Sequence, residues 1–151
     1  MDEVKPQILL FKGKGLISRL IRWQTRSKYS HAAILMRDGN IVESWQGVGV
    51  RVKKPTRWKD IDKFDVPDMT DDQWDAAIGF AKAQVGKGYD YWAIARFISR
   101  RHLPANNKWF CSELVFSAIK SVGVSLLERI YCDEVSPGVL SHSPMLKKSV
   151  D

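Results

Sequence analysis

Short apolar blocks, separated by polar and glycine-rich stretches, recur along the chain and predict a mixture of strands and helices. Short apolar or alternating runs predict β-strands at 7–11, 30–36, 41–45, within 47–58 and within 60–67. Apolar residues at helical spacing predict helices at 16–28, 71–85, 92–101 and 111–122. We expect a late strand or extended segment at 129–135 and a surface coil after residue 138. No repeat, linker or low-complexity stretch divides the chain, so we expect a single domain over residues 1–151.

Two of the predicted helices differ in character. The helix at 71–85 has a capping box at Thr70 and Gln73 and one clean apolar face, which indicates a structural role. The helix at 16–28 is basic and amphipathic, with one face marked by Leu16, Ile17, Leu20, Ile21 and Gln24. Such a helix suits an anionic membrane surface, but more often it packs on its own domain with its charges in water.

Charge is distributed unevenly along the chain. Residues 1–65 contain 14 Lys and Arg against 7 Asp and Glu, whereas residues 66–151 contain 10 of each, so the net charge of +7 lies in the first part. This asymmetry favours an anionic partner or surface, although a basic face that only aids solubility explains it equally well. No stretch approaches the ~20 apolar residues that span a bilayer, and the first residues lack a signal-peptide pattern. We therefore expect a cytoplasmic protein whose two cysteines are free thiols.

Cys111 is the first candidate for chemistry, because it lies where the predicted helix at 111–122 begins. Unpaired backbone N–H groups and the positive end of the helix dipole meet at such a position and stabilise a thiolate, the nucleophilic form of cysteine. The backbone N–H of Cys111 could also donate to a developing oxyanion. The alternative is that Cys111 is a small buried apolar residue, as most lone cysteines are.

His31 and Glu43 are candidates for a general base and the carboxylate that orients it. They lie on two predicted strands joined by a turn at Asp38-Gly39. A two-residue turn would place Gln46 opposite His31 and point Glu43 to the other face. A three-residue loop would leave Glu43 four positions along the strand, roughly 13 Å away. On this reasoning Glu43 reaches His31 only through a bulge, a strong twist or an irregular turn.

Five motifs occur in an order that is more specific than any one of them. They are Ser30-His31-Ala32-Ala33-Ile34, Ile41-Val42-Glu43-Ser44, Gly88-Tyr89-Asp90-Tyr91, Trp109-Phe110-Cys111-Ser112-Glu113-Leu114-Val115 and Ser136-Pro137-Gly138-Val139-Leu140. From about Ile8 to Pro144 the chain resembles the YiiX-like group of the NlpC-type cysteine peptidase superfamily, which are circularly permuted papain-like proteins related to lecithin retinol acyltransferase. One departure is Pro6-Gln7, where such proteins often have Gly-Asp before the first strand.

The resemblance implies an α+β, circularly permuted papain-like (NlpC-like) fold, with an antiparallel sheet packed against helices. It implies Cys111 as nucleophile, His31 as general base and Glu43 as the residue that orients His31. A carboxylate in that role would fix the tautomer with Nε2 of His31 free for Cys111. The implied activity is that of a thiol hydrolase or acyltransferase without a cofactor, which forms an acyl-enzyme on an amide (peptide or isopeptide) or a lipid ester. Peptide, cell-wall and lipid substrates all fit. Many such proteins are exported, so delivery as a phage or secreted effector stays open beside the cytoplasmic expectation.

Three other functions are weaker. A binding module that keeps the fold without turnover, recognising an anionic lipid or cell-wall ligand, would be favoured if a member of the triad were missing, and all three candidates are present. A metal site would have to draw on His31, His102, Cys111, Cys132 and His142, which show no metal-ligand spacing, so we expect no metal. A specific nucleic-acid site is not expected, because charge and tryptophans occur without a recognition motif. The sequence does not determine the oligomeric state.

Overall fold

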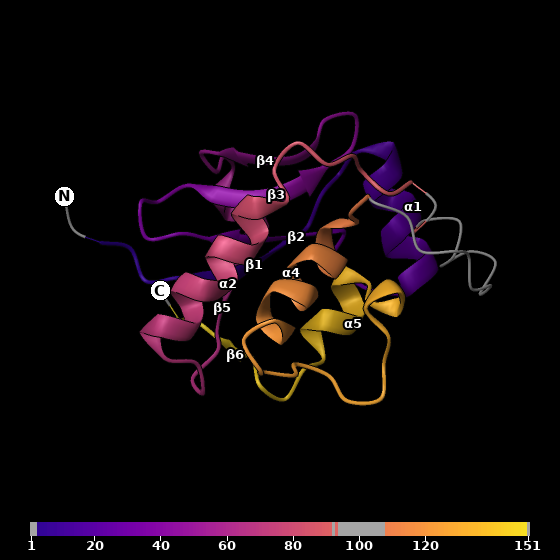
Figure 1. Cartoon of the computed structure of the whole chain (residues 1–151). Coiled ribbons are helices and arrows are strands. Elements are labelled where there is room, and N and C mark those ends of the chain that lie inside the picture. The colour runs from indigo at the N-terminus through magenta and orange to yellow at the C-terminus, as the bar shows by residue number, and fades with distance from the viewer. Residues whose placement is uncertain (1–2, 92, 94–107, 151) are drawn as a thin grey trace.

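The computed structural model describes residues 3–91, 93 and 108–150, and its centre is a six-stranded antiparallel sheet (Figure 1). The strands are β1 (Gln7–Phe11), β2 (His31–Leu35), β3 (Ile41–Trp45), β4 (Gly49–Lys53), β5 (Ile61–Asp65) and β6 (Lys147–Lys148), in the spatial order β4-β3-β2-β1-β5-β6. The α-helices are α1 (Leu16–Thr25), α2 (Asp71–Ala83), α4 (Cys111–Lys120) and α5 (Pro137–Ser141), and two short 3₁₀ helices are η1 (Trp58–Asp60) and η2 (Cys132–Glu134). The helix expected at 92–101 lies almost wholly outside the described residues.

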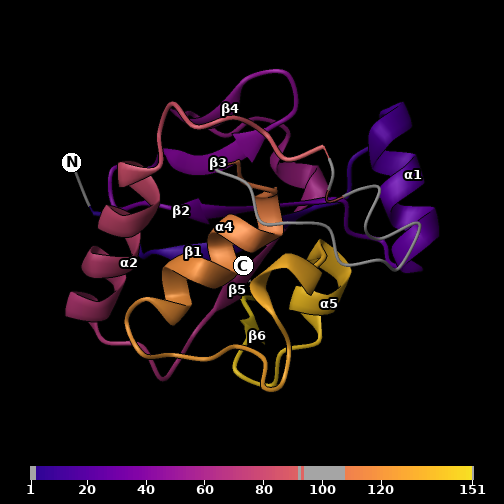
Figure 2. The same cartoon turned by 45° about the vertical axis from the view of Figure 1, so that its right-hand side comes forward.

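Helices α2, α4 and α5 lie on one side of the sheet, and α1 stands at one end of it (Figures 1 and 2). The main core forms between the sheet and these helices, with Ile34 and Val42 of the sheet in one cluster with Leu114 and Ile119 of α4. The ten residues of α4 include seven buried ones. Burial on this scale fixes where α4 starts relative to the strands, which matters because its first residue is Cys111.

The opposite face of the sheet has its own small apolar cluster, composed of Leu9, Ala33, Leu35, Ile41 and Ile61 with Phe11 packed against it. His31, Glu43 and Trp45 share this face, because side chains alternate along a strand. The segment 54–60 connects β4 at the sheet edge to β5 beyond β1, and several of its residues line a cavity with Phe11 and His31. This crossover segment therefore covers the face that carries His31.

The hairpin between β2 and β3 corrects the expected geometry. The backbone N–H of Met36 donates to the Asn40 carbonyl at 2.8 Å, so the loop consists of the three residues between them, with Gly39 at a φ of 82°. The paired residues are Leu35 with Ile41 and Ile34 with Val42. Continued toward His31, this register places Glu43 one diagonal step away on the same face, within reach of a long side chain. The expected separation was wrong, because the loop closes at Met36 rather than one residue further on.

Two other expectations were wrong. The stretch 129–135 contains the 3₁₀ helix η2 instead of a strand. The end of the chain is not a surface coil: α5 begins at Pro137 with the Ser136 hydroxyl accepting from Val139 N at 3.1 Å, and β6 pairs with β5. The apolar face of α1 is divided, because Ile21 is buried but Leu16 and Leu20 are exposed. In the part of the chain that the structure describes, no helix has the length and apolar character to cross a bilayer.

Candidate active site

His31 is the first residue of β2 and is held between two aromatic rings. Phe11 of β1 and Trp45 of β3 meet its ring edge-on, with ring centroids 4.9 and 5.0 Å from that of His31. Phe11 is also the register partner of His31 across β1 and β2. The imidazole is therefore buried and confined, as a proton-transfer group must be if it is to keep one orientation.

Glu43 supplies the carboxylate partner of His31. Its Oε1 lies 3.0 Å from Nε2 of His31, and the side chain is only 2 % exposed. The other oxygen, Oε2, accepts a hydrogen bond from Nε of Arg51 at 2.9 Å and forms an ion pair with Nη2 of Arg51 at 2.9 Å. Burial works to raise the pKa of Glu43, but the hydrogen bonds and charges of His31 and Arg51 outweigh it and hold that pKa below its usual value.

Sequence reasoning missed Arg51. It lies directly opposite Glu43 in the β3–β4 ladder, and its guanidinium also sits over the Trp45 ring at 5.3 Å from the centroid. The available signal was the alternation of Val50, Arg51 and Val52, which points Arg51 to the same face as Glu43 once the pairing of the two strands is known.

The hydrogen bond to Glu43 also corrects which nitrogen of His31 is available. We expected Nε2 to be left for Cys111, but Nε2 is the atom that bonds to Glu43. The ring nitrogen that Glu43 does not occupy is Nδ1. Gln46, the alternative partner, lines the nearby cavity and is not the residue that His31 contacts through Nε2.

Cys111 is the first residue of α4 and is 1 % exposed. The residue before it, Phe110, provides no side-chain cap, so no side chain from that position competes for the N–H groups of the first helical turn. The entry to the helix is tied to the sheet, because the Ser44 hydroxyl of β3 donates to the Trp109 carbonyl at 2.6 Å. Trp109 in turn donates its N–H to Gly88 at 2.9 Å, so the glycine–tyrosine motif supports the same loop.

His31 is the point where Cys111 and Glu43 meet. Burial lowers the pKa of His31, but the nearby Cys111, followed by Glu43, more than reverses this effect and raises the pKa to about 9. An imidazole with this pKa is protonated at neutral pH. The structure thus brings the three predicted residues together around one positively charged ring.

Tyr89 forms part of the surroundings of Cys111. Both residues belong to one buried cluster, and the Tyr89 ring packs on Phe110 with centroids 5.7 Å apart. Burial and the neighbouring charge of Cys111 raise the pKa of Tyr89 well above its usual value. Its hydroxyl is therefore neutral at any physiological pH.

The remaining metal-site candidates do not converge on this centre. Cys132 is a free thiol in η2, and His142 is an exposed residue at the end of α5. His102 lies outside the described residues. Among the described residues, no group of three or more His, Cys, Asp or Glu side chains is arranged to hold a metal ion.

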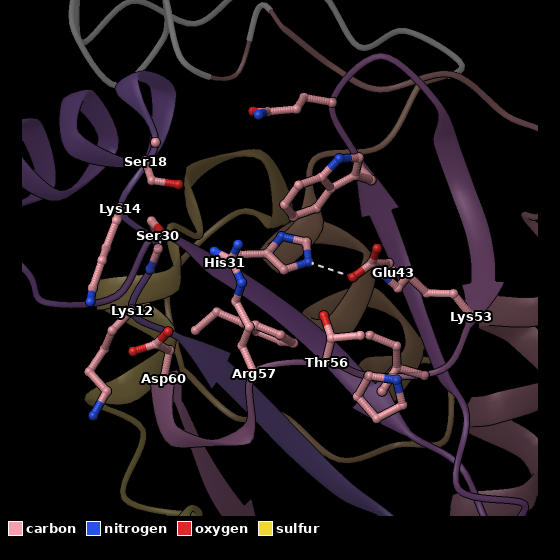
Figure 3. A pocket seen from close by; sticks show the side chains of 17 residues that line it. Lys12, Lys14, Ser18, Ser30, His31, Glu43, Lys53, Thr56, Arg57 and Asp60 are labelled. Carbon is pink, nitrogen blue, oxygen red and sulfur yellow. Dashed lines mark hydrogen bonds and ion pairs between the residues drawn. The ribbon is translucent and has the colours of Figure 1, made fainter.

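A cavity of about 430 Å³ opens beside His31 and Glu43 (Figure 3). Its walls come from the end of β1, the start of α1, strands β2 and β3, and the crossover segment 54–60. His31 forms part of the wall, so a molecule in the cavity would contact the imidazole.

Comparison with known proteins supports the fold. No family model matches the chain. The crystal structure of the metalloprotein YiiX from Escherichia coli O157:H7 superposes with a TM-score of 0.71 at 18% sequence identity, over 99% of this chain and 98% of that one. The chain has the YiiX fold. The resemblance to the YiiX-like group and the α+β, permuted papain-like architecture are thereby confirmed.

A second comparison concerns sequence. The chain is 29% identical over 157 aligned positions to the probable lipoprotein peptidase YaeF of Escherichia coli K12. The alignment covers 80% of this chain but only 57% of YaeF, so the chain spans little more than half the length of this relative.

Proposed function

We propose that this protein is a cysteine-dependent hydrolase or acyltransferase that works through an acyl-enzyme on Cys111. The observation that carries the proposal is the buried His31 imidazole, which bonds through Nε2 to Glu43 at 3.0 Å and whose pKa Cys111 and Glu43 together raise to about 9. A thiol beside an imidazole that a carboxylate orients is the arrangement of an activated nucleophile. The similarity to a protein named a probable lipoprotein peptidase supports hydrolysis of the peptidase type.

In the first half of the reaction, the thiolate sulfur of Cys111 attacks the substrate carbonyl carbon, and a C–S bond forms. The electron pair of the C=O bond moves to the oxygen, where the backbone N–H of Cys111 at the start of α4 stabilises it. When the C=O bond re-forms, the bond to the leaving nitrogen or oxygen breaks, and the His31 imidazolium donates its proton from Nδ1 to the leaving group.

In the second half, neutral His31 accepts a proton from water or from another acceptor hydroxyl or amine. The deprotonated atom attacks the thioester carbonyl, the C–S bond breaks, and the thiolate and imidazolium are restored. Glu43 keeps the ring in one orientation and stabilises its charge through Nε2, while Arg51 keeps Glu43 ionised.

The exposed side of α1 supports a substrate at an anionic lipid surface. Leu16, Leu20 and Trp23 occupy one helical stripe and are 85%, 38% and 73% exposed. The exposed arginines Arg19 and Arg26 are on the same helix and at its C-terminal cap. An apolar stripe with arginines beside it fits peripheral contact with anionic lipids, and we extend the proposal to such contact through residues 16–28.

Trapping of the acyl-enzyme tests the proposed function. Wild-type protein and the Cys111→Ser variant are mixed with p-nitrophenyl acetate and examined by intact-mass and peptide-level mass spectrometry. We expect acetylation of Cys111 in the wild type and no turnover in the variant, which keeps the fold because the substitution conserves shape. The proposal would be overturned if the Cys111→Ser variant hydrolysed the ester at the same rate as the wild type. Parallel hydrolysis screens with phospholipids and cell-wall peptides then separate ester from amide substrates.

A further inference from the structure

We propose that the cavity beside His31 is a subsite for an anionic group of the substrate, a phosphate or a carboxylate, held by Arg57 and Lys14. This inference rests on the proposed function, because it places the anion next to the ring that serves Cys111. It adds a substrate class: molecules that carry a negative charge near the bond to be cleaved.

The charges of the cavity wall are unbalanced. The lining includes Lys12, Lys14, Lys53 and Arg57 against Glu43 and Asp60. The charge of Glu43 is already engaged by His31 and Arg51, and Lys12 lies 3.4 Å from Asp62. Within the described part of the chain, no carboxylate pairs with Lys14, Lys53 or Arg57. Unpaired cations around a concave site attract an anion more strongly than the same cations on an open surface.

Arg57 is placed for this task at a conformational cost. Its φ of 57° puts it in the left-handed region, which residues other than glycine rarely adopt. In Figure 3 the side chain of Arg57 extends from the crossover segment toward His31, and Lys14 lies on the α1 side of the cavity. Strained backbone that directs a guanidinium into a cavity is the pattern expected of a binding residue. Arginine suits phosphate and carboxylate because its planar group can donate two parallel hydrogen bonds.

Hydroxyl donors complete the site at the α1 side. Ser18 and Ser30 both line the cavity, and their hydroxyls crowd against Gly13. A Cβ at Gly13 would lie 2.5 Å from Ser18 Oγ and 2.7 Å from Ser30 Oγ, so only glycine permits this approach. The backbone N–H of Gly13 donates to Ser30 Oγ at 3.1 Å, which leaves the hydroxyl proton of Ser30 available to an anion.

Histidine NMR provides a direct test, because the protein has three histidines and His31 borders the cavity. The ring signals of His31 are followed while inorganic phosphate or acetate is added at constant ionic strength, with chloride as the reference anion. We expect a saturable shift of the His31 signals with phosphate. Arg57→Gln and Lys14→Gln should each weaken the apparent affinity by about threefold or more, as a lost charge contact does. Lys59→Gln, an exposed position outside the cavity lining, should leave it unchanged.

Two additional arms sharpen the result. Dihexanoyl phosphatidic acid below its micelle concentration is compared with inorganic phosphate. Binding tighter by about tenfold identifies a lipid headgroup, and equal binding identifies a small phosphate compound. Iodoacetamide labelling of Cys111 in the same samples reports on the proposed function separately. The subsite proposal fails if phosphate moves His31 no more than chloride does, or if Arg57→Gln and Lys14→Gln bind phosphate as the wild type does, even when Cys111 remains reactive.

Discussion

Arg51 lies opposite Glu43 on the neighbouring strand, donates its Nε–H to Oε2 of Glu43 at 2.9 Å and places Nη2 2.9 Å from the same oxygen. The second oxygen of Glu43 is thereby left for His31 Nε2, at 3.0 Å. Glu43 is buried, and an isolated buried carboxylate would tend to take up a proton. Arg51 opposes that tendency, so the chain from Arg51 through Glu43 to His31 keeps a negative charge beside the imidazole.

Replacement of Glu43 by glutamine should lower the pKa of His31. The side-chain shape is kept, but the charge that helps to raise this pKa to about 9 is lost, so the imidazolium titrates at lower pH. The alkaline limb of the pH–rate profile, where the imidazolium loses its proton, should therefore move to lower pH. We also expect the maximal rate to fall by about tenfold or more. The measurement is a pH–rate profile with p-nitrophenyl acetate. An alkaline limb at the same pH as in the wild type would show that Glu43 does not influence the pKa of His31.

Replacement of Arg51 by glutamine should act at the acidic end instead. The hydrogen bond and charge of Arg51 help to keep the pKa of Glu43 low, and their loss raises it. On acidification, Glu43 then takes up its proton and loses its stabilising charge at a higher pH than in the wild type. The acidic limb of the pH–rate profile should therefore move to higher pH. Lys54→Gln, at an exposed residue just after the same strand, is the matched control. Equal acidic limbs in both variants would show that Arg51 has only a structural role.

The helix α1 should determine binding to anionic vesicles. Removal of an exposed apolar side chain weakens interfacial binding in proportion to the area lost. We therefore expect Trp23→Ser to reduce co-sedimentation with phosphatidylglycerol-containing vesicles severalfold, while Trp58→Ser, also an exposed tryptophan, has little effect. Pure phosphatidylcholine vesicles should bind less protein than the anionic ones. Equal losses in both variants, or no dependence on lipid charge, would argue against peripheral contact through α1.

Features encoded within a few residues could be predicted from the sequence. The capping box at Thr70 and Gln73 is present in both directions at the start of α2. The helix that begins at Cys111 is present as well, because its apolar spacing extends over several turns. Ser136 and Pro137 also indicate a helix start, and this signal was overlooked among the polar residues of the tail.

Features that depend on pairing between segments could not be derived in the same way. The side chain opposite His31 changes with each shift of the hairpin loop, and closing the loop one residue too late displaced Glu43 by two positions along its strand. Arg51 acquires its partner only through the β3–β4 register. On the apolar face of α1, Ile21 is buried and Leu16 is exposed. This difference depends on what packs against the helix, and the sequence of the helix alone does not determine that. Resemblance to a known family indicated Glu43 where local geometry did not.

The most direct test of the central claim compares the two thiols in the folded protein. Burial alone predicts that Cys132, which is partly exposed, reacts faster than Cys111, which is 1 % exposed. Activation of Cys111 by the helix start and by His31 predicts the opposite order, because an activated cysteine reacts faster than an ordinary thiol of equal exposure. Limited iodoacetamide labelling near neutral pH, read by peptide mass spectrometry, should show Cys111 modified at least about tenfold faster than Cys132, and His31→Gln should remove most of this difference. Equal rates, or faster labelling of Cys132 in the wild type, would contradict Cys111 as the activated nucleophile.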